Sequence, residues 1–173
     1  MEKIMETVAG LMALSARTAP KAVGQDFLQI KIITGQEIEQ LANEMVRYGL
    51  ESGRPNYDRD GENVRRSEAV LLLSLLNARN LGTNCGACGF PSCAAAEAAR
   101  KEGEEFLGPT CAWRVLDLGI ALGSAVKTAS LLNADNRVMY RIGVVARKMN
   151  LIEGEIAIGV PLSATGKSIY FDR

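Results

Sequence analysis

Residues 84–93 of this chain read Asn-Cys-Gly-Ala-Cys-Gly-Phe-Pro-Ser-Cys, and one further cysteine follows at position 111. The four cysteines of the chain therefore share one spacing, Cys85-x2-Cys88-x4-Cys93-x17-Cys111. Four thiolates are the ligand set that a cubane iron–sulfur cluster needs, and no cysteine is left over. The spacing predicts a 4Fe-4S site whose metal ligands are these four side chains.

The residues around the cysteines suit a loop that wraps a cluster. Gly86 and Gly89 each follow a cysteine, and glycine reaches positive φ at low cost in a tight turn. We expect their backbone N–H groups, with neighbouring ones, to offset the negative charge of the thiolates. Residues 94–101 predict a short helix after the loop. Trp113 is expected mainly to fill the core, and it would also shield the cluster from water.

Other readings of the four cysteines remain open. A structural zinc site uses four thiolates as well, although it usually takes them from two Cys-x2-Cys pairs and this chain has one. Disulfides fit poorly, because the chain has no secretory features and cytosolic thiols stay reduced. A thioredoxin-like pair would leave Cys93 and Cys111 without a role. The spacing favours iron and sulfide over these alternatives.

Composition limits the possible functions further. At 173 residues the chain can form one good core, with or without a small metal-stapled module. Twenty basic and twenty acidic residues cancel, so nothing indicates nucleic acid or an anionic membrane as partner. Histidine is absent, which excludes imidazole-ligated metals and catalytic triads. The N-terminus does not resemble a signal peptide and the longest apolar run is short, so we expect a soluble, cytoplasmic protein.

The first half of the chain predicts a helix, a strand, a helix and a second strand. Apolar residues recur at helical spacing over residues 2–15, and residues 28–32 alternate as a strand does. Residues 34–37 form the pattern of a capping box before a helix that ends near residue 49. Residues 54–61 are polar and predict a loop. Residues 69–76 are apolar on both faces and predict a central strand.

The second half predicts two helices and a last strand. Residues 116–132 predict a helix with a face of small residues, which would admit another backbone or a flat ligand. Residues 137–149 predict a helix that buries Val138, Ile142, Val145 and Met149. Residues 155–160 predict a strand that Pro161 ends. The whole reads as an α+β fold, helix-rich with a small sheet, in which a cysteine module (residues 80–113) is inserted between two scaffold parts, 1–79 and 114–173.

The cysteine pattern resembles a known domain. Cys85-x2-Cys88-Gly89-x3-Cys93-x17-Cys111 is similar to the domain that binds a four-iron cluster in the RnfB-type electron-transport subunit and in corrinoid iron–sulfur proteins. The resemblance covers about thirty residues. It implies that Cys85, Cys88, Cys93 and Cys111 are the cluster ligands.

The whole chain resembles a family of bacterial and archaeal proteins described as containing a ferredoxin domain. Residues 16–21 (Ala-Arg-Thr-Ala-Pro-Lys), the cysteine cluster and residues 159–173 carry the match. The family name implies a cluster and no assigned reaction.

A further similarity is to flavin-dependent nitroreductases, which also begin with a helix, an Ala-Pro segment, a strand and a helix. Their late strand and basic tail are echoed by residues 155–161 and by Lys167 with Arg173. Their Arg-Arg-Ser start is missing, and Lys21 stands where their motif has serine. The resemblance implies a nitroreductase-like scaffold, usually a homodimer, which could hold FMN, hold a smaller ligand, or have lost the site.

These observations lead to one expected function and two alternatives. We expect an iron–sulfur protein that transfers one electron at a time, with a redox partner protein or a small-molecule acceptor. A flavin-dependent reductase is the first alternative. A zinc- or cluster-stapled sensing or interaction module is the second. The sequence leaves enzymatic activity and catalytic residues open.

Overall fold

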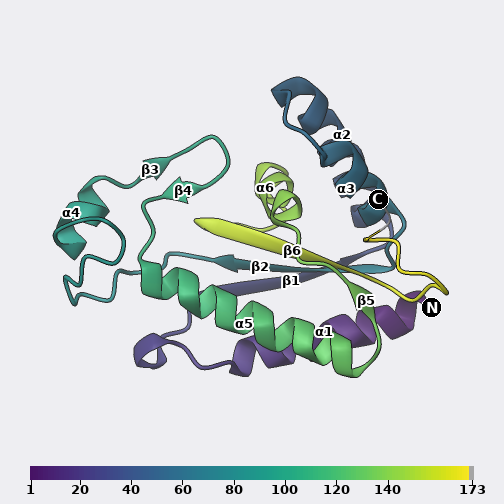
Figure 1. Ribbon diagram of the computed structural model, residues 1–173, viewed down its shortest axis with the longest axis horizontal. Helices are drawn as coiled ribbons and strands as arrows, with labels where there is room; N and C mark the ends of the chain where they lie inside the picture. Colours follow the sequence, from purple (N-terminus) through teal and green to yellow (C-terminus); the bar gives the residue numbers. More distant parts are fainter. Residues whose placement is uncertain (172–173) are drawn as a thin grey trace.

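The computed structural model describes residues 1–171. Its main sheet has four strands in the order β1-β2-β6-β5, and every neighbouring pair is antiparallel. The strands are β1 (Leu28–Thr34), β2 (Ala69–Leu75), β6 (Ile156–Ser163) and the short β5 (Asp135–Asn136). Helices cover both faces of this sheet (Figure 1). The helix-rich α+β architecture with a small sheet is therefore confirmed.

Strand β2 is the central strand that its apolar sequence predicts. All seven of its residues are buried, because β1 and β6 flank it and helices lie on both faces. Strand β6 runs past Pro161, which pairs with Val70, so the expected end of the strand at this proline is wrong. Gly159 exchanges backbone hydrogen bonds with Met139. Since backbone groups alternate sides along a strand, Pro161 turns its nitrogen the same way, and the ladder to β2 needs no N–H from it.

Two long helices, α1 (Glu2–Thr18) and α5 (Ala112–Leu131), lie side by side on one face of the sheet (Figure 1). The small residues of α5 are divided between its two sides. Alanines occupy the side that packs in the core with α1 and β2, namely Ala121, Ala125 and Ala129. Gly119 and Gly123 lie on the opposite, exposed side, where a Cβ atom would meet nothing within 4 Å. The sequence predicts one small-residue face, and the helix has two.

The other face carries α2 (Gln36–Ser52), α3 (Tyr57–Arg65) and α6 (Tyr140–Lys148). The expected capping box is wrong, because Thr34 belongs to β1 and Gly35 is the N-cap without a side-chain hydrogen bond. The expected loop over residues 54–61 is also wrong, since most of it forms α3. That helix has few apolar residues, but Tyr57 and Val64 are almost fully buried on its inner side.

Helix α6 begins later than predicted, because Met139 is extended and pairs with Gly159 of β6 through two backbone hydrogen bonds. Ile142 and Val145 are fully buried as expected, whereas Val138 precedes the helix and is 45% exposed. Gly143 lets α6 lie directly against β6, since a Cβ there would stand 1.8 Å from the carbonyl oxygen of Ala157. Within the described residues 1–171, no helix has the length and apolar character to cross a bilayer.

The cysteine module lies beyond one end of the sheet (Figure 1). It contains α4 (Cys93–Ala98) and a two-stranded sheet of β3 (Lys101–Glu102) and β4 (Leu107–Gly108). Helix α4 is shorter than the predicted helix over residues 94–101, because Lys101 already pairs in β3. The remaining helical segment is η1 (Ala22–Gly24), a single 3-10 turn between α1 and β1.

Candidate metal centre

The loop after β2 turns where its glycines allow it. Gly86 and Gly89 have φ values of 75° and 85°, in the region that the sequence predicts for them. Asn84 also has positive φ, and its Oδ1 accepts a hydrogen bond of 2.8 Å from the backbone N–H of Cys93. Ser92 caps α4 by accepting from the N–H of Ala95 at 3.1 Å. These contacts bring both ends of the loop together.

The four cysteines line one small cavity in this loop. Cys93 begins α4, and Cys111 directly precedes α5, so the four cysteines come from a loop and two helix ends. Cys85 is exposed, Cys88 and Cys93 are half-buried, and Cys111 is buried. Within residues 1–171 no three Cys, Asp or Glu side chains close onto one point as the ligands of a single ion do. The cysteines therefore share the lining of one cavity without meeting at a single point.

Hydrogen bonds favour the thiolate form of Cys85. The backbone N–H of Ala87, the hydroxyl of Thr83 and the indole N–H of Trp113 lower the pKa of this thiol to about 7. The indole Nε1 lies 3.3 Å from the sulfur. The N–H of Gly89 donates to the carbonyl of Gly86, and its expected role as a donor to a bound cluster stays a prediction.

Trp113 has a different place from the one expected. Its side chain is 41% exposed, so it does not fill the core. It instead covers the most exposed cysteine of the four and donates to its sulfur. The spacing of two residues after Cys111 hinted at proximity to the site, but nothing in the sequence indicated a hydrogen bond to Cys85.

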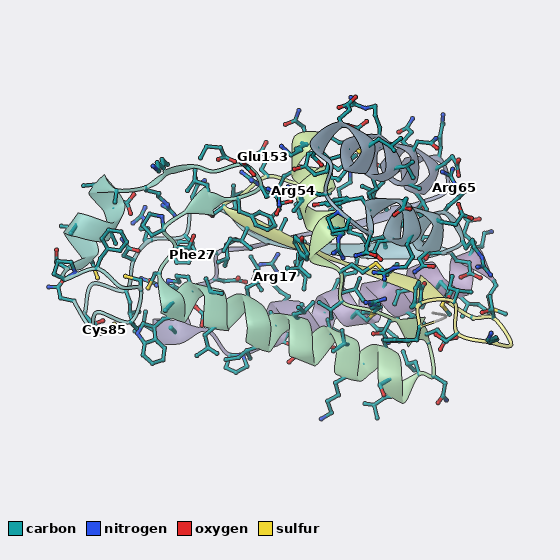
Figure 2. The ribbon with its side chains drawn as sticks, turned by 45° about the horizontal axis from the view of Figure 1, so that its top comes forward. Arg17, Phe27, Arg54, Arg65, Cys85 and Glu153 are labelled. Carbon is teal, nitrogen blue, oxygen red and sulfur yellow. The ribbon has the colours of Figure 1, made fainter. Side chains whose placement is uncertain are left out.

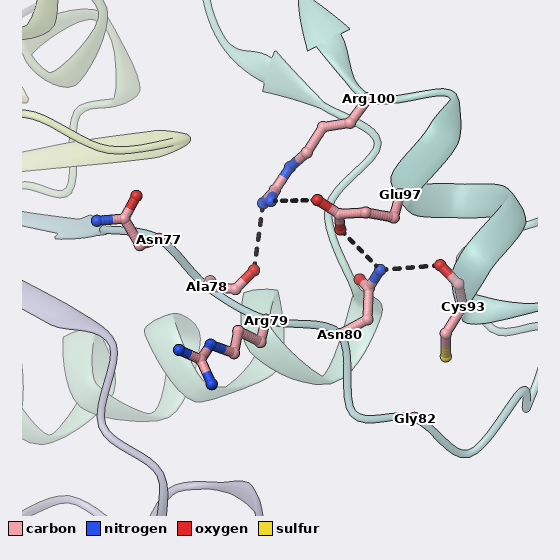
Figure 3. A pocket seen from close by; sticks show the side chains of 8 residues that line it. All are labelled: Asn77, Ala78, Arg79, Asn80, Gly82, Cys93, Glu97 and Arg100. Atoms are coloured by element: carbon pink, nitrogen blue, oxygen red, sulfur yellow. Dashed lines mark hydrogen bonds and ion pairs between the residues drawn. The ribbon is translucent and has the colours of Figure 1, made fainter.

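Polar contacts tether the module to the end of the sheet (Figure 3). Asn80 donates to the carbonyl of Cys93 and to Glu97, both at 3.1 Å. Arg100 donates to the carbonyl of Ala78 at 3.3 Å and to the buried carboxylate of Glu155 at 3.1 Å. Glu155 also accepts from the N–H of Ala78. The two chain segments that leave and re-enter the scaffold are thus joined by charge-assisted bonds.

Arg114 is a fully buried arginine one turn after Cys111, and the sequence analysis missed it. Its guanidinium donates to Asp117, which lies next to it on α5, at 3.1 Å. It also donates to the carbonyls of Ala22 (3.1 Å) and Arg79 (2.9 Å), and it lies over the ring of Phe27. An Arg and an Asp three residues apart on the buried side of a helix were the available signal. Arg114 thereby joins the start of the module, η1 and α5.

The residues at the flavin-motif position do not fit a phosphate. The side chain of Lys21 is 6% exposed, and its Nζ donates to the carbonyls of Ala16, Arg17 and Ala19 at 2.7–3.1 Å. It therefore caps the C-terminus of α1. Arg17 pairs with Asp26 at 2.6 Å. Both cations of this segment are committed within the protein, and Arg173 of the basic tail lies outside the described residues.

Solved structures of nitroreductases share the fold. The nitroreductase CinD from Lactococcus lactis, in complex with chloramphenicol, superposes with a TM-score of 0.62 over 97% of this chain and 84% of its own, at 17% identity. The FMN-dependent nitroreductase NfnB from Mycobacterium smegmatis gives 0.61 over 93% and 78%, at 12% identity. The nitroreductase-like scaffold that the element order predicts is confirmed.

Sequence comparisons identify the cysteine segment and the family. A family model described as "Putative Fe-S cluster" matches residues 82–107, and one described as "Uncharacterized protein containing a ferredoxin domain" matches residues 107–173. An uncharacterized protein of Archaeoglobus fulgidus is 49% identical over 169 residues, which cover 98% of this chain and 91% of the relative. The chain is thus an iron–sulfur protein and belongs to the family of proteins that contain this ferredoxin domain.

Proposed function

We propose that the protein binds one 4Fe-4S cluster through Cys85, Cys88, Cys93 and Cys111 and transfers single electrons. The observation that carries the proposal is the single cavity that all four cysteines line. The match of residues 82–107 to an iron–sulfur family supports it. In this proposal residues 80–113 act as a module inserted between the scaffold parts 1–79 and 114–173.

The bound cluster would supply a centre that gains and loses one electron at a time. The chain contributes the environment of that centre. Ala87, Thr83 and Trp113 direct hydrogen-bond donors at Cys85, which stabilises negative charge on its sulfur. Cys111 is buried, whereas Cys85 is exposed, and Cys85 lies in the loop at the outer end of the molecule (Figure 2). Electrons would therefore pass to a partner or small-molecule acceptor on the Cys85 side, where the least protein intervenes.

The flavin-dependent reductase is the main alternative. The shared fold favours it, since the similar enzymes include an FMN-dependent one. The residues at the motif position oppose it, because Lys21 caps α1 and Arg17 is paired with Asp26. A flavin would need other cations for its phosphate. The electron carrier is thus the better-supported function.

A sensing or interaction module is the second alternative, with zinc or a cluster as its staple. It needs only the four thiolates and a surface that changes when metal is lost.

The proposal also concerns the cellular compartment. Exposed thiolate ligands need a reducing compartment, so the proposal places the protein in the cytoplasm.

A homodimer fits the exposed side of α5. Leu116 is 49% and Ile120 37% exposed there, next to Gly119 and Gly123, above which space is open. Small residues allow close approach of a second copy along this helix. Size-exclusion chromatography with light scattering tests this, and a monomer at micromolar concentration would refute it.

The first test is an anaerobic purification followed by absorbance, iron, acid-labile sulfide and flavin analysis of one sample. We expect about four irons and four sulfides per chain, as a cubane cluster contains. Zinc without sulfide would contradict the proposal and favour the stapled module. Flavin at one equivalent would favour the reductase.

The substitution Cys88→Ser tests the ligand assignment. It should abolish the brown colour and lower the midpoint of thermal unfolding, because cluster binding is linked to folding of the module. Ser130→Ala, a substitution at an exposed position of α5 outside the cysteine loop, is the control and should keep its iron. A Cys88→Ser protein with full iron and sulfide would overturn the assignment.

A further inference from the structure

A second cavity lies against the metal centre, on the scaffold side of α4 (Figure 3). Its volume is about 440 Å³, enough for a small molecule. One wall is the linker that follows β2, within residues 77–82. The other wall is formed by Cys93 and Glu97 of α4 and by Arg100, which follows this helix. Cys93 lines both this cavity and the cysteine cavity. A molecule bound here would therefore lie next to a cluster ligand.

The acidic group of this cavity is already engaged. Glu97 accepts from Asn80 through one carboxylate oxygen, at 3.1 Å, and from Arg100 through the other, at 3.5 Å. Arg100 is in turn bound to Glu155 at 3.1 Å. The charges of Arg100, Glu97 and Glu155 thus serve mainly the tether between module and scaffold; among their polar atoms, Arg100 Nε and Glu155 Oε2 are buried without a hydrogen-bond partner in residues 1–171.

The side chains of this cavity that remain available to a ligand are hydrogen-bond donors. The exposed guanidinium of Arg79 makes no hydrogen bond or ion pair with any side chain or backbone group of residues 1–171, and neither does the side-chain amide of Asn77. The backbone of Arg79 is fixed, because its carbonyl accepts from Arg114 at 2.9 Å. Arg79 therefore offers an unpaired cation, on an anchored backbone, in the lining of a cavity whose one lining acid, Glu97, is already bonded.

We propose that this cavity binds a small molecule through an anionic oxygen group, a carboxylate or a phosphate, which Arg79 holds. A guanidinium recognises both groups with two parallel N–H donors, and Asn77 can add a neutral donor. The role of the bound anion rests on the proposed function. With a cluster in place, the site would bring an anionic acceptor or regulator beside Cys93.

The position next to the centre has a measurable consequence. The oxidised centre carries one negative charge less than the reduced one, so an anion beside Cys93 should bind the oxidised state more tightly. By linkage, a bound anion must then lower the midpoint potential of the centre. Arg79 reduces this repulsion without removing it.

The experiment uses the full chain, purified anaerobically with its metal centre. Sodium acetate and sodium phosphate are titrated separately by calorimetry at constant ionic strength, and the midpoint potential is measured with and without each. We expect saturable binding of at least one anion and a lower potential in its presence. Arg79→Gln should weaken that binding about tenfold or more, as the loss of a charged hydrogen bond does. Whether acetate or phosphate binds shows whether the site takes a planar carboxylate or a tetrahedral phosphate.

The matched control is Arg66→Gln, which removes another exposed arginine at the end of α3, far from this cavity. It should bind the anions as the wild type does. Absence of saturable binding, or equal weakening by both substitutions, overturns the inference while a complete cluster keeps the proposed function. A preparation without iron and sulfide overturns the proposed function, and calorimetry on that same chain still decides whether Arg79 binds an anion.

Discussion

The sheet scaffold and the cysteine module are held by different forces. Every residue of β2 is at most 1% exposed, and apolar side chains cover both faces of the strand. Within residues 80–113 only Ala96 and Cys111 are buried. Burial of apolar surface, worth about 25 cal/mol per Å², therefore stabilises the scaffold far more than the module. In the proposed function, the module depends on its bound cluster and on the polar contacts that join it to the scaffold.

Arg114 connects the two regions, so its loss should give the largest effect. Arg114→Met keeps the length of the side chain and removes its bonds to Ala22, Arg79 and Asp117. It leaves the buried carboxylate of Asp117 without its cation, which should cost about 3–5 kcal/mol in the free energy of unfolding. Denaturant titration of the cluster-loaded protein measures this.

A second substitution separates the lost charge pair from lost packing. In Arg114→Met with Asp117→Asn the uncompensated buried charge is gone, and we expect part of the stability to return. Arg47 provides the surface control, because it pairs with Glu51 on the exposed side of α2. Arg47→Met should change the free energy of unfolding by less than about 1 kcal/mol. If Arg114→Met lowered the free energy of unfolding by less than about 1 kcal/mol as well, the bonds of Arg114 would not be what holds the module to the scaffold.

Within the scaffold, Leu72→Ala should destabilise by about 2–5 kcal/mol, since its side chain is fully buried in the central strand. The iron content of the molecules that remain folded should not change, because Leu72 is remote from the cysteines in the sheet. Denaturant titration gives the first quantity and iron analysis of the soluble fraction the second. Parallel loss of iron from folded protein would mean that the two regions are not energetically distinct.

The scaffold was predictable where burial imposes a period on the sequence. Strand β2 has apolar residues on both faces and lies at the centre, and Ile142 and Val145 of α6 are buried as predicted. The prediction failed for α3, because a helix with only a few inward apolar residues gives no period. It also failed at Pro161, because proline is tolerated where its nitrogen turns away from the paired strand.

The candidate metal centre was proposed from the chemistry of its residues and not from a period of apolar residues, and its four ligands stay a prediction. Cysteine spacing reports ligand chemistry directly, and glycine at residues 86 and 89 reports positive φ. What could not be predicted are contacts between residues far apart in the chain. The bond from Trp113 to Cys85 and the bonds from Arg114 to the carbonyls of Ala22 and Arg79 depend on how α5 docks, which no local pattern encodes.

Trp113→Phe tests whether a single hydrogen bond in the module alters the midpoint potential of the centre. It keeps an aromatic ring and removes the N–H that donates to Cys85. The midpoint potential of the centre should become more negative, because hydrogen bonds to cluster sulfurs stabilise the added electron. Stability should change by less than about 1 kcal/mol, as the ring is partly exposed. Potentiometry is the measurement, and Leu116→Ala, an exposed apolar position one turn later on α5, should leave the potential unaltered.

The smallest expected effect concerns the β3–β4 hairpin, which charged residues hold against α6. Arg147 donates to the carbonyl of Glu105 at 2.7 Å and to Glu102 at 3.0 Å, and Lys148 donates to the carbonyl of Glu104. Arg147→Gln should cost about 1 kcal/mol or less, because these pairs lie near the surface. Its effect should be local: the N–H of Gly103, bonded to Phe106, should exchange with solvent faster.

High salt should act in the same direction as this substitution, since screening weakens surface charge pairs and leaves apolar burial intact. Hydrogen exchange measured at low and high ionic strength therefore separates the two regions in one protein. Exchange over residues 101–108 should rise while exchange in β2 stays constant. A uniform rise in both would mean that the hairpin opens only when the scaffold unfolds, and the module would then be a cooperative part of the scaffold.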